Sequence, residues 1–239
     1  MKVWVRPFLI VVLLIASAMM SQTGVAGVAD RISSMTVNKL QKELPILGMA
    51  AGDAVLIRTF KKESRLELWM KPKNSQRYVL FRTYPICAYS GGLGPKIRRG
   101  DRMTPEGFYA IKKNGLNPHS RFHLSMDIGY PNRYDRYLRR TGSLLMIHGA
   151  CDSIGCFAMS NQQMEEIYYL VEQALQNGQL SVPVHAFPFH LSDVAIEQQK
   201  NNKWYGFWWQ LKMGYDAFNQ SKQIPDVEAL DGRYVITIP

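Results

Sequence analysis

Runs of apolar residues with a period of two mark the part of the chain that follows residue 50. Residues 54–60 (AVLIRTF) are almost continuously apolar, residues 66–70 alternate Leu, Leu and Met with Glu and Trp, and residues 77–84 (RYVLFRTY) are aromatic and β-branched. These features are typical of β-strands. Because only short runs of turn residues separate the segments, the pattern predicts an antiparallel meander.

Later apolar runs predict further strands, and one long segment interrupts the series. Residues 114–140 are polar, aromatic and basic, with prolines at positions 118 and 131, and they predict a long excursion. Excursions of this kind often cover active sites. The further strands are expected at residues 108–111, 144–147, 182–189 and 232–238.

Helical periodicity is clearest over residues 160–177. Ser160 and Gln163 match a capping box at its start, and Gly178 follows as a terminator. Residues 203–213 predict a second helix with an aromatic stripe on one face. Such a stripe favours packing on the domain, and an exposed binding surface is the alternative. Together with the strands, these helices predict a fold that is mainly β with some α.

The first 29 residues have the pattern of an export signal. A basic start with Lys2 and Arg6 precedes an apolar run over residues 8–20, and small residues lead to an expected cleavage after Ala26 or Ala29. The apolar run is shorter than the about 20 residues that span a bilayer. An uncleaved signal anchor is the alternative, and in that case the segment is the chain's contact with a membrane.

The patterns divide the chain into four parts. Residues 1–29 are the expected signal peptide, and residues 30–48 are a connecting segment with a short helix near residues 37–44. Residues 49–190 hold the strand series and the first long helix, and residues 191–239 form a helical C-terminal extension that packs on this domain.

The chain is basic, with a formal net charge of +10. Lys2 and Arg6 are the charged residues of the signal segment, so about +8 remains after cleavage. An exported basic protein suits an anionic polymer outside the cytoplasm, and plain solubility is the alternative. Export separates the chain from nucleic acid, so we expect no nucleic-acid partner.

Three cysteines are an odd number for an exported chain. In an oxidising compartment two of them tend to pair. A Cys87–Cys151 bond leaves Cys156 free, whereas a Cys151–Cys156 bond closes a small loop. The residues alone do not choose between these pairings, although a function for the Cys156 thiol favours the first.

The strongest chemical signal lies in residues 146–159 (MIHGACDSIGCFAM), which follow an apolar run. An imidazole and a thiol are the minimal equipment for covalent acyl transfer, with His148 as general base and Cys156 as nucleophile. The amides of Gly155 and Cys156 are natural oxyanion donors. Ser153 could orient the substrate or the imidazole, whose second nitrogen is expected to rest on a backbone carbonyl.

Two other interpretations of this segment remain open. Cys156 could be a structural thiol near a core histidine, because buried cysteines are common and inert. A metal site is the other alternative, and zinc would need three or four converging ligands. The candidate ligands are His148, Cys151, Asp152 and Cys156. No motif surrounds the remaining histidines, which are expected on the surface or in the core: His119, His123, His185 and His190.

Several separated segments together resemble the L,D-transpeptidases, the YkuD-type cysteine enzymes of bacterial cell walls. Residues 147–156 are similar to the family's active-site motif, residues 89–96 (YSGGLGPK) to its glycine loop, and residues 104–109 (TPEGFY) to the segment that leads into its next strand. The likeness is strongest to the YafK-like branch. It extends there from about Val55 to the C-terminus and includes Tyr134-Asp135-Arg136, residues 208–212 (WWQLK) and residues 232–235 (GRYV).

The resemblance implies a β-sandwich catalytic domain and a role for each residue that matches. Cys156 is then the nucleophile and His148 the base, supported by Gly155, Ser153 and Gly149. Cys87 and Cys151 are the disulfide candidates, because that branch also has cysteines there. Neither a cofactor nor a metal is implied. The substrate-binding candidates are Tyr89, Gly91, Tyr134 and Arg136.

The implied substrate is the peptide stem of peptidoglycan, attacked at the diamino acid at position three, in the periplasm of a Gram-negative bacterium. Most of the family has [ST]-H-G-C, and here Ile154 replaces that histidine, in a spacer that is also shorter than usual. We therefore expect either transfer through a thioester or hydrolysis. The hydrolase would cut wall peptides or release a wall-attached lipoprotein. A non-catalytic wall-binding module is the remaining alternative.

Overall fold

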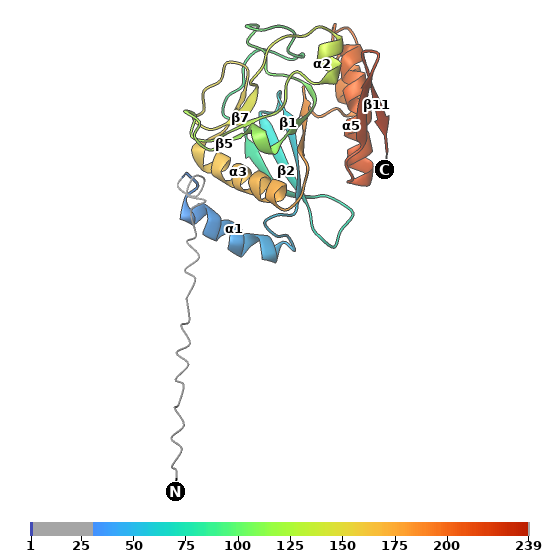
Figure 1. The fold of residues 1–239 in the computed structure, drawn as a ribbon. Coiled ribbons are helices and arrows are strands. Elements are labelled where there is room, and N and C mark those ends of the chain that lie inside the picture. The colour runs from blue at the N-terminus through green and yellow to red at the C-terminus, as the bar shows by residue number, and fades with distance from the viewer. Residues whose placement is uncertain (2–30, 239) are drawn as a thin grey trace.

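The computed structural model describes Met1 and residues 31–238, so the expected signal peptide lies outside the described residues apart from Met1. A five-stranded sheet with the order β3-β2-β1-β9-β4 forms its centre (Figure 1). The first three strands form the predicted antiparallel meander, β9 runs parallel to β1, and β4 closes the edge antiparallel to β9. The strands are β1 (Ala54–Phe60), β2 (Arg65–Lys71), β3 (Val79–Pro85), β4 (Gly107–Ile111) and β9 (Val182–Phe187).

A second, four-stranded sheet has the order β5-β6-β7-β8. Its strands are only two or three residues long: β5 (Leu116–Asn117), β6 (Ser125–Asp127), β7 (Met146–His148) and β8 (Phe157–Ala158). The strand expected at residues 144–147 overlaps β7, whereas the other three are too short to show an alternation and were not predicted. The expectation of one long excursion over residues 114–140 is therefore wrong in part. That segment supplies β5, β6 and the short helix α2 (Arg133–Tyr137), and the 3-10 turn η1 (Lys113–Gly115) begins just before it.

The two sheets share one hydrophobic core, as expected of a sandwich. Ile57 and Leu68 come from the five-stranded sheet, and Met126, Ile147 and Phe157 come from the four-stranded sheet. All five side chains are fully buried. At about 25 cal/mol per Å² of apolar surface removed from water, this shared core is the main favourable term for the fold.

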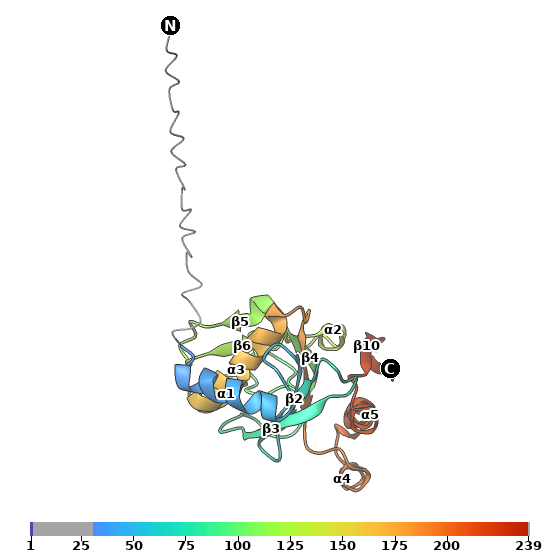
Figure 2. The ribbon, with the colours of Figure 1, turned by 90° about the horizontal axis from the view of Figure 1, so that it is seen from below.

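The predicted long helix is α3 (Asn161–Gln176), and Ser160 and Gln163 form its capping box as expected. It contacts β1, β9 and β6, so it touches both sheets. The helix α1 (Ser34–Ile46) packs against α3 and buries Leu40 and Leu44 (Figures 1 and 2). Residues 30–48 were expected to be a connecting segment, but they also contribute Leu40 and Leu44 to the hydrophobic core. Among the described residues, no helix is both long and apolar enough to cross a membrane.

The C-terminal extension carries an aromatic cluster of its own. The helix α5 (Tyr205–Ser221) is longer than predicted and buries Phe207, Trp208 and Leu211 against Phe60 and its neighbours. Its stripe therefore packs on the domain, which was the favoured interpretation. The other elements are α4 (Asp193–Glu197), β10 (Asp226–Leu230), which was not predicted, and β11 (Arg233–Thr237), which pairs with it.

A fully buried ion pair joins the domain to this extension. Lys61, just after β1, donates hydrogen bonds from Nζ to Glu106 Oε1 and to the carbonyls of Gly94 and Thr104, each 3.0 Å long. Glu106 in turn accepts from the N–H of Gly94 at 2.7 Å and from Nε1 of Trp208 at 2.8 Å. Burial lowers the pKa of Lys61, and Glu106 opposes that shift.

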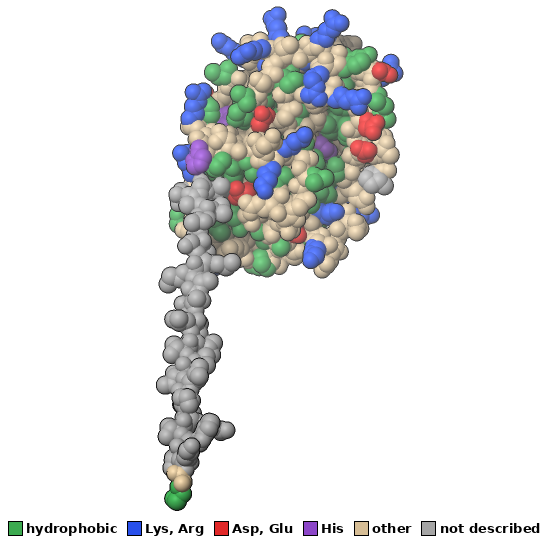
Figure 3. Space-filling model, viewed as in Figure 1, with side chains coloured by type: hydrophobic (Ala, Val, Ile, Leu, Met, Phe, Trp, Pro, Cys, Tyr) green, Lys and Arg blue, Asp and Glu red, His purple; other side chains and the backbone are tan. Residues whose placement is uncertain are grey.

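Lysine and arginine side chains are spread over the face shown in Figure 3, where they predominate over aspartate and glutamate. This distribution agrees with the net charge of +10. It gives the surface a positive field without one dominant basic stripe.

Replacing Glu106 by Gln should lower the free energy of unfolding by about 3–5 kcal/mol, because it leaves the buried Lys61 charge without its partner. Urea unfolding followed by circular dichroism measures the change. The control is Glu197→Ala, which removes the exposed Lys200–Glu197 pair and should cost less than about 1 kcal/mol. Equal losses for the two variants would contradict the account.

Candidate active site

Alternation along the four-stranded sheet decides which side chains share its outer face. Met126, Ile147 and Phe157 point into the core. Since successive strand residues point to opposite faces, the residues beside them lie on the other side of the sheet. The pairing register aligns Ser125, His148 and Ala158 in one row across β6, β7 and β8. Cys156 immediately precedes β8, and its Sγ accepts a hydrogen bond from the N–H of Met146 in β7. The sheet thus brings the predicted nucleophile against the strand that carries the predicted base.

Cys156 immediately precedes β8 and carries the free thiol of the chain. Its Sγ accepts a hydrogen bond from the N–H of Met146 at 3.4 Å and lies 3.9 Å from the carbonyl of Leu144. Burial raises the pKa of the thiol above its usual value, although the Met146 amide opposes this shift. The Asp127 carboxylate adds a smaller increase, and Lys96 a smaller decrease. The resting group is therefore a thiol at neutral pH.

The imidazole of His148 is buried and held by its own loop. Its Nδ1 lies 2.6 Å from the carbonyl of Gly149, so this nitrogen carries the proton and donates it. The tautomer leaves Nε2 unprotonated, which is the form that a general base needs. Burial lowers the pKa of His148, against the opposing effects of Gly149 and Asp152, so the ring is neutral at neutral pH. Phe122 stacks on it at 4.6 Å between ring centroids.

A neutral thiol and a neutral imidazole are the resting state that this geometry supports. Within the described residues, no hydrogen bond joins Sγ of Cys156 to the ring of His148. Apo structures often show such loose contacts, which tighten when substrate binds.

Ser153 and Thr104 fix the backbone of the nucleophile. The Ser153 hydroxyl accepts from the N–H of Cys156 at 2.9 Å and lies 2.8 Å from the carbonyl of the same residue. Thr104 donates to that carbonyl at 3.1 Å and accepts from the N–H of Ser90 at 3.1 Å. Because the N–H of Cys156 already donates to the Ser153 hydroxyl, it is not free to bind an oxyanion. The N–H of Gly155 has no acceptor among the described residues and is therefore the candidate oxyanion donor.

Glycine is required at position 155 by the backbone conformation and at position 149 because a side chain would clash with its neighbours. Gly155 has a φ of +114°, a region that side chains strongly disfavour. A Cβ on Gly149 would lie 2.7 Å from Oδ1 of Asn161 and 2.9 Å from the carbonyl of Phe122. Asn161 Oδ1 also accepts from the N–H of Ala150 at 2.8 Å, which anchors the loop after His148.

A disulfide joins Cys87 to Cys151, which is the first of the two pairings considered. The bond ties the loop between His148 and Cys156 to the end of β3. It spans a sequence separation of 64 residues, for which loop-closure entropy corresponds to about 4 kcal/mol. Cys156 therefore remains free.

A cavity of about 230 Å³ opens at Cys156, with Lys96 and Arg99 in its lining. Gly142, at a φ of +130°, leaves space for Lys96, since a Cβ there would lie 2.8 Å from Cε of the lysine. Lys96 Nζ donates to Asp101 at 2.5 Å. Although burial opposes it, hydrogen bonds from Lys96 and three backbone amides lower the pKa of Asp101 to about 2. The lining suits a substrate with a carboxylate near the scissile carbonyl.

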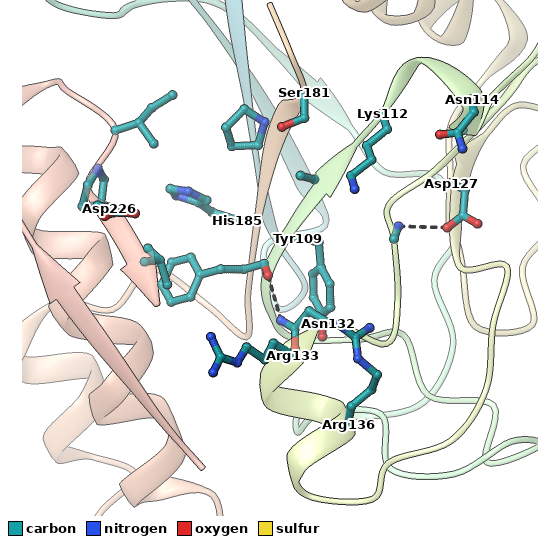
Figure 4. A pocket seen from close by; sticks show the side chains of 18 residues that line it. Tyr109, Lys112, Asn114, Asp127, Asn132, Arg133, Arg136, Ser181, His185 and Asp226 are labelled. Carbon is teal, nitrogen blue, oxygen red and sulfur yellow. Dashed lines mark hydrogen bonds between the residues drawn. The ribbon is translucent and has the colours of Figure 1, made fainter. Parts of the chain in front are cut away.

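The four predicted substrate-binding residues do not line this cavity. Tyr89 packs on the main core, and Gly91 turns the glycine loop at a φ of +77°. Tyr134 is buried between Phe207 and Tyr234, so we assign it to packing. Arg136 lines a separate, larger cavity of about 670 Å³ (Figure 4).

The described residues contain no group of three or more side chains that could hold a metal ion. The remaining histidines lie in varied surroundings. His185 is buried in the core, His190 stacks on Phe60, His123 contacts Glu165, and the backbone N–H of His119 donates to Asn117.

Comparisons with known proteins assign this site to a family. Residues 55–185 match the family described as YkuD, the L,D-transpeptidase catalytic domain. Two relatives, named "Putative L,D-transpeptidase YafK" from Escherichia coli strain K12 and from Escherichia coli O157:H7, are each 43% identical over 230 residues, which are 96% of this chain and 91% of theirs.

This chain belongs to the L,D-transpeptidase family. Among solved structures, the helical cell shape determining protein Pgp2 from Campylobacter jejuni is similar at 17% identity and a TM-score of 0.45, over 79% of each chain.

Several residues around this L,D-transpeptidase site escaped the sequence analysis. Thr104 was assigned only to the segment that leads into the next strand, and Lys96 only to the end of the glycine loop. Ser125, directly opposite His148 in the sheet, has a buried hydroxyl that lacks a partner among the described residues. The strand that carries it, residues 125–127, is only three residues long and too short to be recognised by alternation.

The raised pKa of Cys156 predicts slow alkylation at neutral pH. Labelling by iodoacetamide should be slower at pH 7 than for free cysteine, whose pKa is about 8.5, and should rise only above that pH, because the thiolate is the reactive form. Mass spectrometry after timed labelling measures the rate, and Cys156→Ala is the blank. A rate that is already maximal at pH 6–7 would instead indicate a preformed thiolate–imidazolium pair.

Proposed function

We propose that this chain is an exported cysteine acyltransferase that acts on peptidoglycan peptide stems through a thioester at the position-three diamino acid. The observation that carries the proposal is the free thiol of Cys156. It lies against β7, the strand that carries His148, and opens into a cavity lined by Lys96 and Arg99. Family membership gives this arrangement its chemistry.

The first half-reaction needs one proton acceptor and one oxyanion donor. Sγ of Cys156 transfers its proton to Nε2 of His148 and attacks the carbonyl carbon of the diamino acid. The N–H of Gly155 stabilises the negative oxygen of the tetrahedral intermediate. The intermediate then collapses, the C–N bond to the following group breaks, and the leaving amine takes the proton from His148. The product is a thioester on Cys156.

The second half-reaction determines whether the enzyme transfers or hydrolyses. An incoming amine gives its proton to His148, attacks the thioester and displaces the thiol, which forms a new amide. Water in the same position gives a carboxylate instead. Arg99, which forms no ion pair within the described residues, suits a free carboxylate of a stem and favours wall peptides in either case.

A specific observation keeps hydrolysis as the second candidate. Ile154, which replaces a histidine of the common motif, is 76% exposed beside the Cys156 cavity. An isoleucine offers no polar group to hold or deprotonate an amine. A hydrolase with this site would cut wall peptides or free a lipoprotein joined to them. Export to the periplasm of a Gram-negative bacterium is part of both proposals. The pattern of residues 1–29 supports export, and the family resemblance supports the compartment.

Incubation of the mature protein with purified sacculi, followed by mass analysis of the muropeptides, tests the proposal. New cross-links between two position-three residues, or exchanged terminal residues, would establish transfer. Tripeptide stems or lipoprotein remnants without new links would establish the hydrolase. Cys156→Ala should abolish either product, and His148→Ala should slow its formation by about 10²–10⁴-fold.

His119→Ala is the matched histidine control, because it removes an exposed imidazole that does not line the Cys156 cavity. It should retain the product pattern of the parent. Sacculi unchanged by the parent protein would contradict both enzymatic proposals and would favour a wall-binding module.

A further inference from the structure

The cavity of about 670 Å³ in Figure 4 is separate from the catalytic centre and contains neither Cys156 nor His148. Its walls come from β4 and η1, from the end of β6, from α2, and from β9 and β10. A volume of this size accommodates a ligand as large as a short peptide.

Charges of both signs face this cavity without partners of their own. Lys112, Arg133 and Arg136 line it, and none of the three forms an ion pair within the described residues. Asp226 reaches the cavity from β10, on the side away from the two α2 arginines in Figure 4, and it too has no ion-pair partner there. A concave site with separated, uncompensated charges is suited to a ligand that carries both signs.

A buried, unsatisfied side chain in the lining also indicates a ligand. His185 is only 2% exposed and lies among Asp226, Ser181 and Tyr109 in Figure 4. Its Nδ1 has no hydrogen-bond partner in the described structure. Burial, together with the nearby Arg58, lowers its pKa to about 3, so the ring is neutral. An orphaned buried polar group is rare, and a polar ligand in the cavity would supply the missing hydrogen bond.

The charge pattern favours a peptide over a phosphate. Inorganic phosphate would gain from the three cations but would face the carboxylates of Asp226 and Asp127. A peptide with free carboxylates and a free amine satisfies both kinds of group. The neutral side chains of Asn114 and Ser181, which also line the cavity, offer hydrogen bonds to its amides.

The cavity adjoins the catalytic face through Asp127. This residue lines the cavity and pairs with Met146 of β7. One strand spacing of about 5 Å separates Asp127 from Met146, and the N–H of Met146 donates a hydrogen bond of 3.4 Å to Sγ of Cys156. A ligand in the cavity therefore lies within one stem peptide's length of the thiol.

We propose that this cavity binds a second peptidoglycan stem, with the stem carboxylates on Lys112, Arg133 and Arg136 and the diamino-acid amine on Asp226. The proposal rests on the proposed function, since it takes its ligand from the same polymer. Holding a neighbouring stem keeps the enzyme on the wall between turnovers, because the next stem then meets the thiol at a high effective concentration.

Calorimetric titration of the mature Cys156→Ala protein with free L-Ala–D-Glu–diamino acid–D-Ala tetrapeptide tests the proposal. Two binding sites are expected. Arg133→Glu should abolish one site or weaken it at least tenfold, because the exposed arginine is replaced by a charge that repels the stem. The matched control is Arg139→Glu, an exposed arginine close by that does not line the cavity and should leave both sites intact.

Three further probes distinguish the chemistry of the ligand. A tetrapeptide with amidated carboxylates and one with acetylated amines should each lose the second site. Inorganic phosphate should not displace the peptide from it. A single site in the parent, equal effects of the two arginine variants, or full competition by phosphate would overturn the proposal. Because the protein used cannot turn over, this result is independent of what the sacculi assay shows.

Discussion

The buried pair of Lys61 and Glu106 is the constraint on which the rest of this structure depends. Its two charged groups carry hydrogen bonds to the glycine loop at Gly94, to the backbone of Thr104 and to the indole of Trp208. One pair thus joins the end of β1, two loops and the C-terminal helix. Since either charge without the other would be costly in the core, these segments can only fold together.

A short chain of contacts connects the Lys61–Glu106 pair to the candidate active site. Glu106 and Lys61 hold the segment that contains Thr104, and the Thr104 hydroxyl holds the carbonyl of Cys156. The disulfide between Cys87 and Cys151 fixes the loop that joins His148 to Cys156. The nucleophile therefore sits on a rigid backbone, while its sulfur and the ring of His148 remain neutral until substrate brings them together. Such preorganisation is what an acyl-transfer site needs.

How much the sequence could predict depended on the length of each pattern. Strands of seven residues, such as Ala54–Phe60, and a helix with a capping box at Ser160 were predicted correctly because propensity and periodicity agree over many residues. The strands that carry His148 and flank Cys156 are two or three residues long. These strands form only because they pair in the folded protein. No local pattern could therefore show that His148 and Cys156 lie at the same sheet. The residues alone left the partner of Cys151 open, and the family resemblance, not a local pattern, pointed to the Cys87–Cys151 bond that the structure contains.

The central claim is that Cys156 forms an acyl-enzyme with a wall peptide. Intact-protein mass spectrometry of the mature protein, quenched with acid shortly after mixing with a tetrapeptide muropeptide, tests it most directly. The account predicts a mass increase equal to that of the disaccharide tripeptide less one water, located on Cys156, released by hydroxylamine and absent from Cys156→Ala. An adduct on another residue, or product formation that persists in Cys156→Ala, would contradict it.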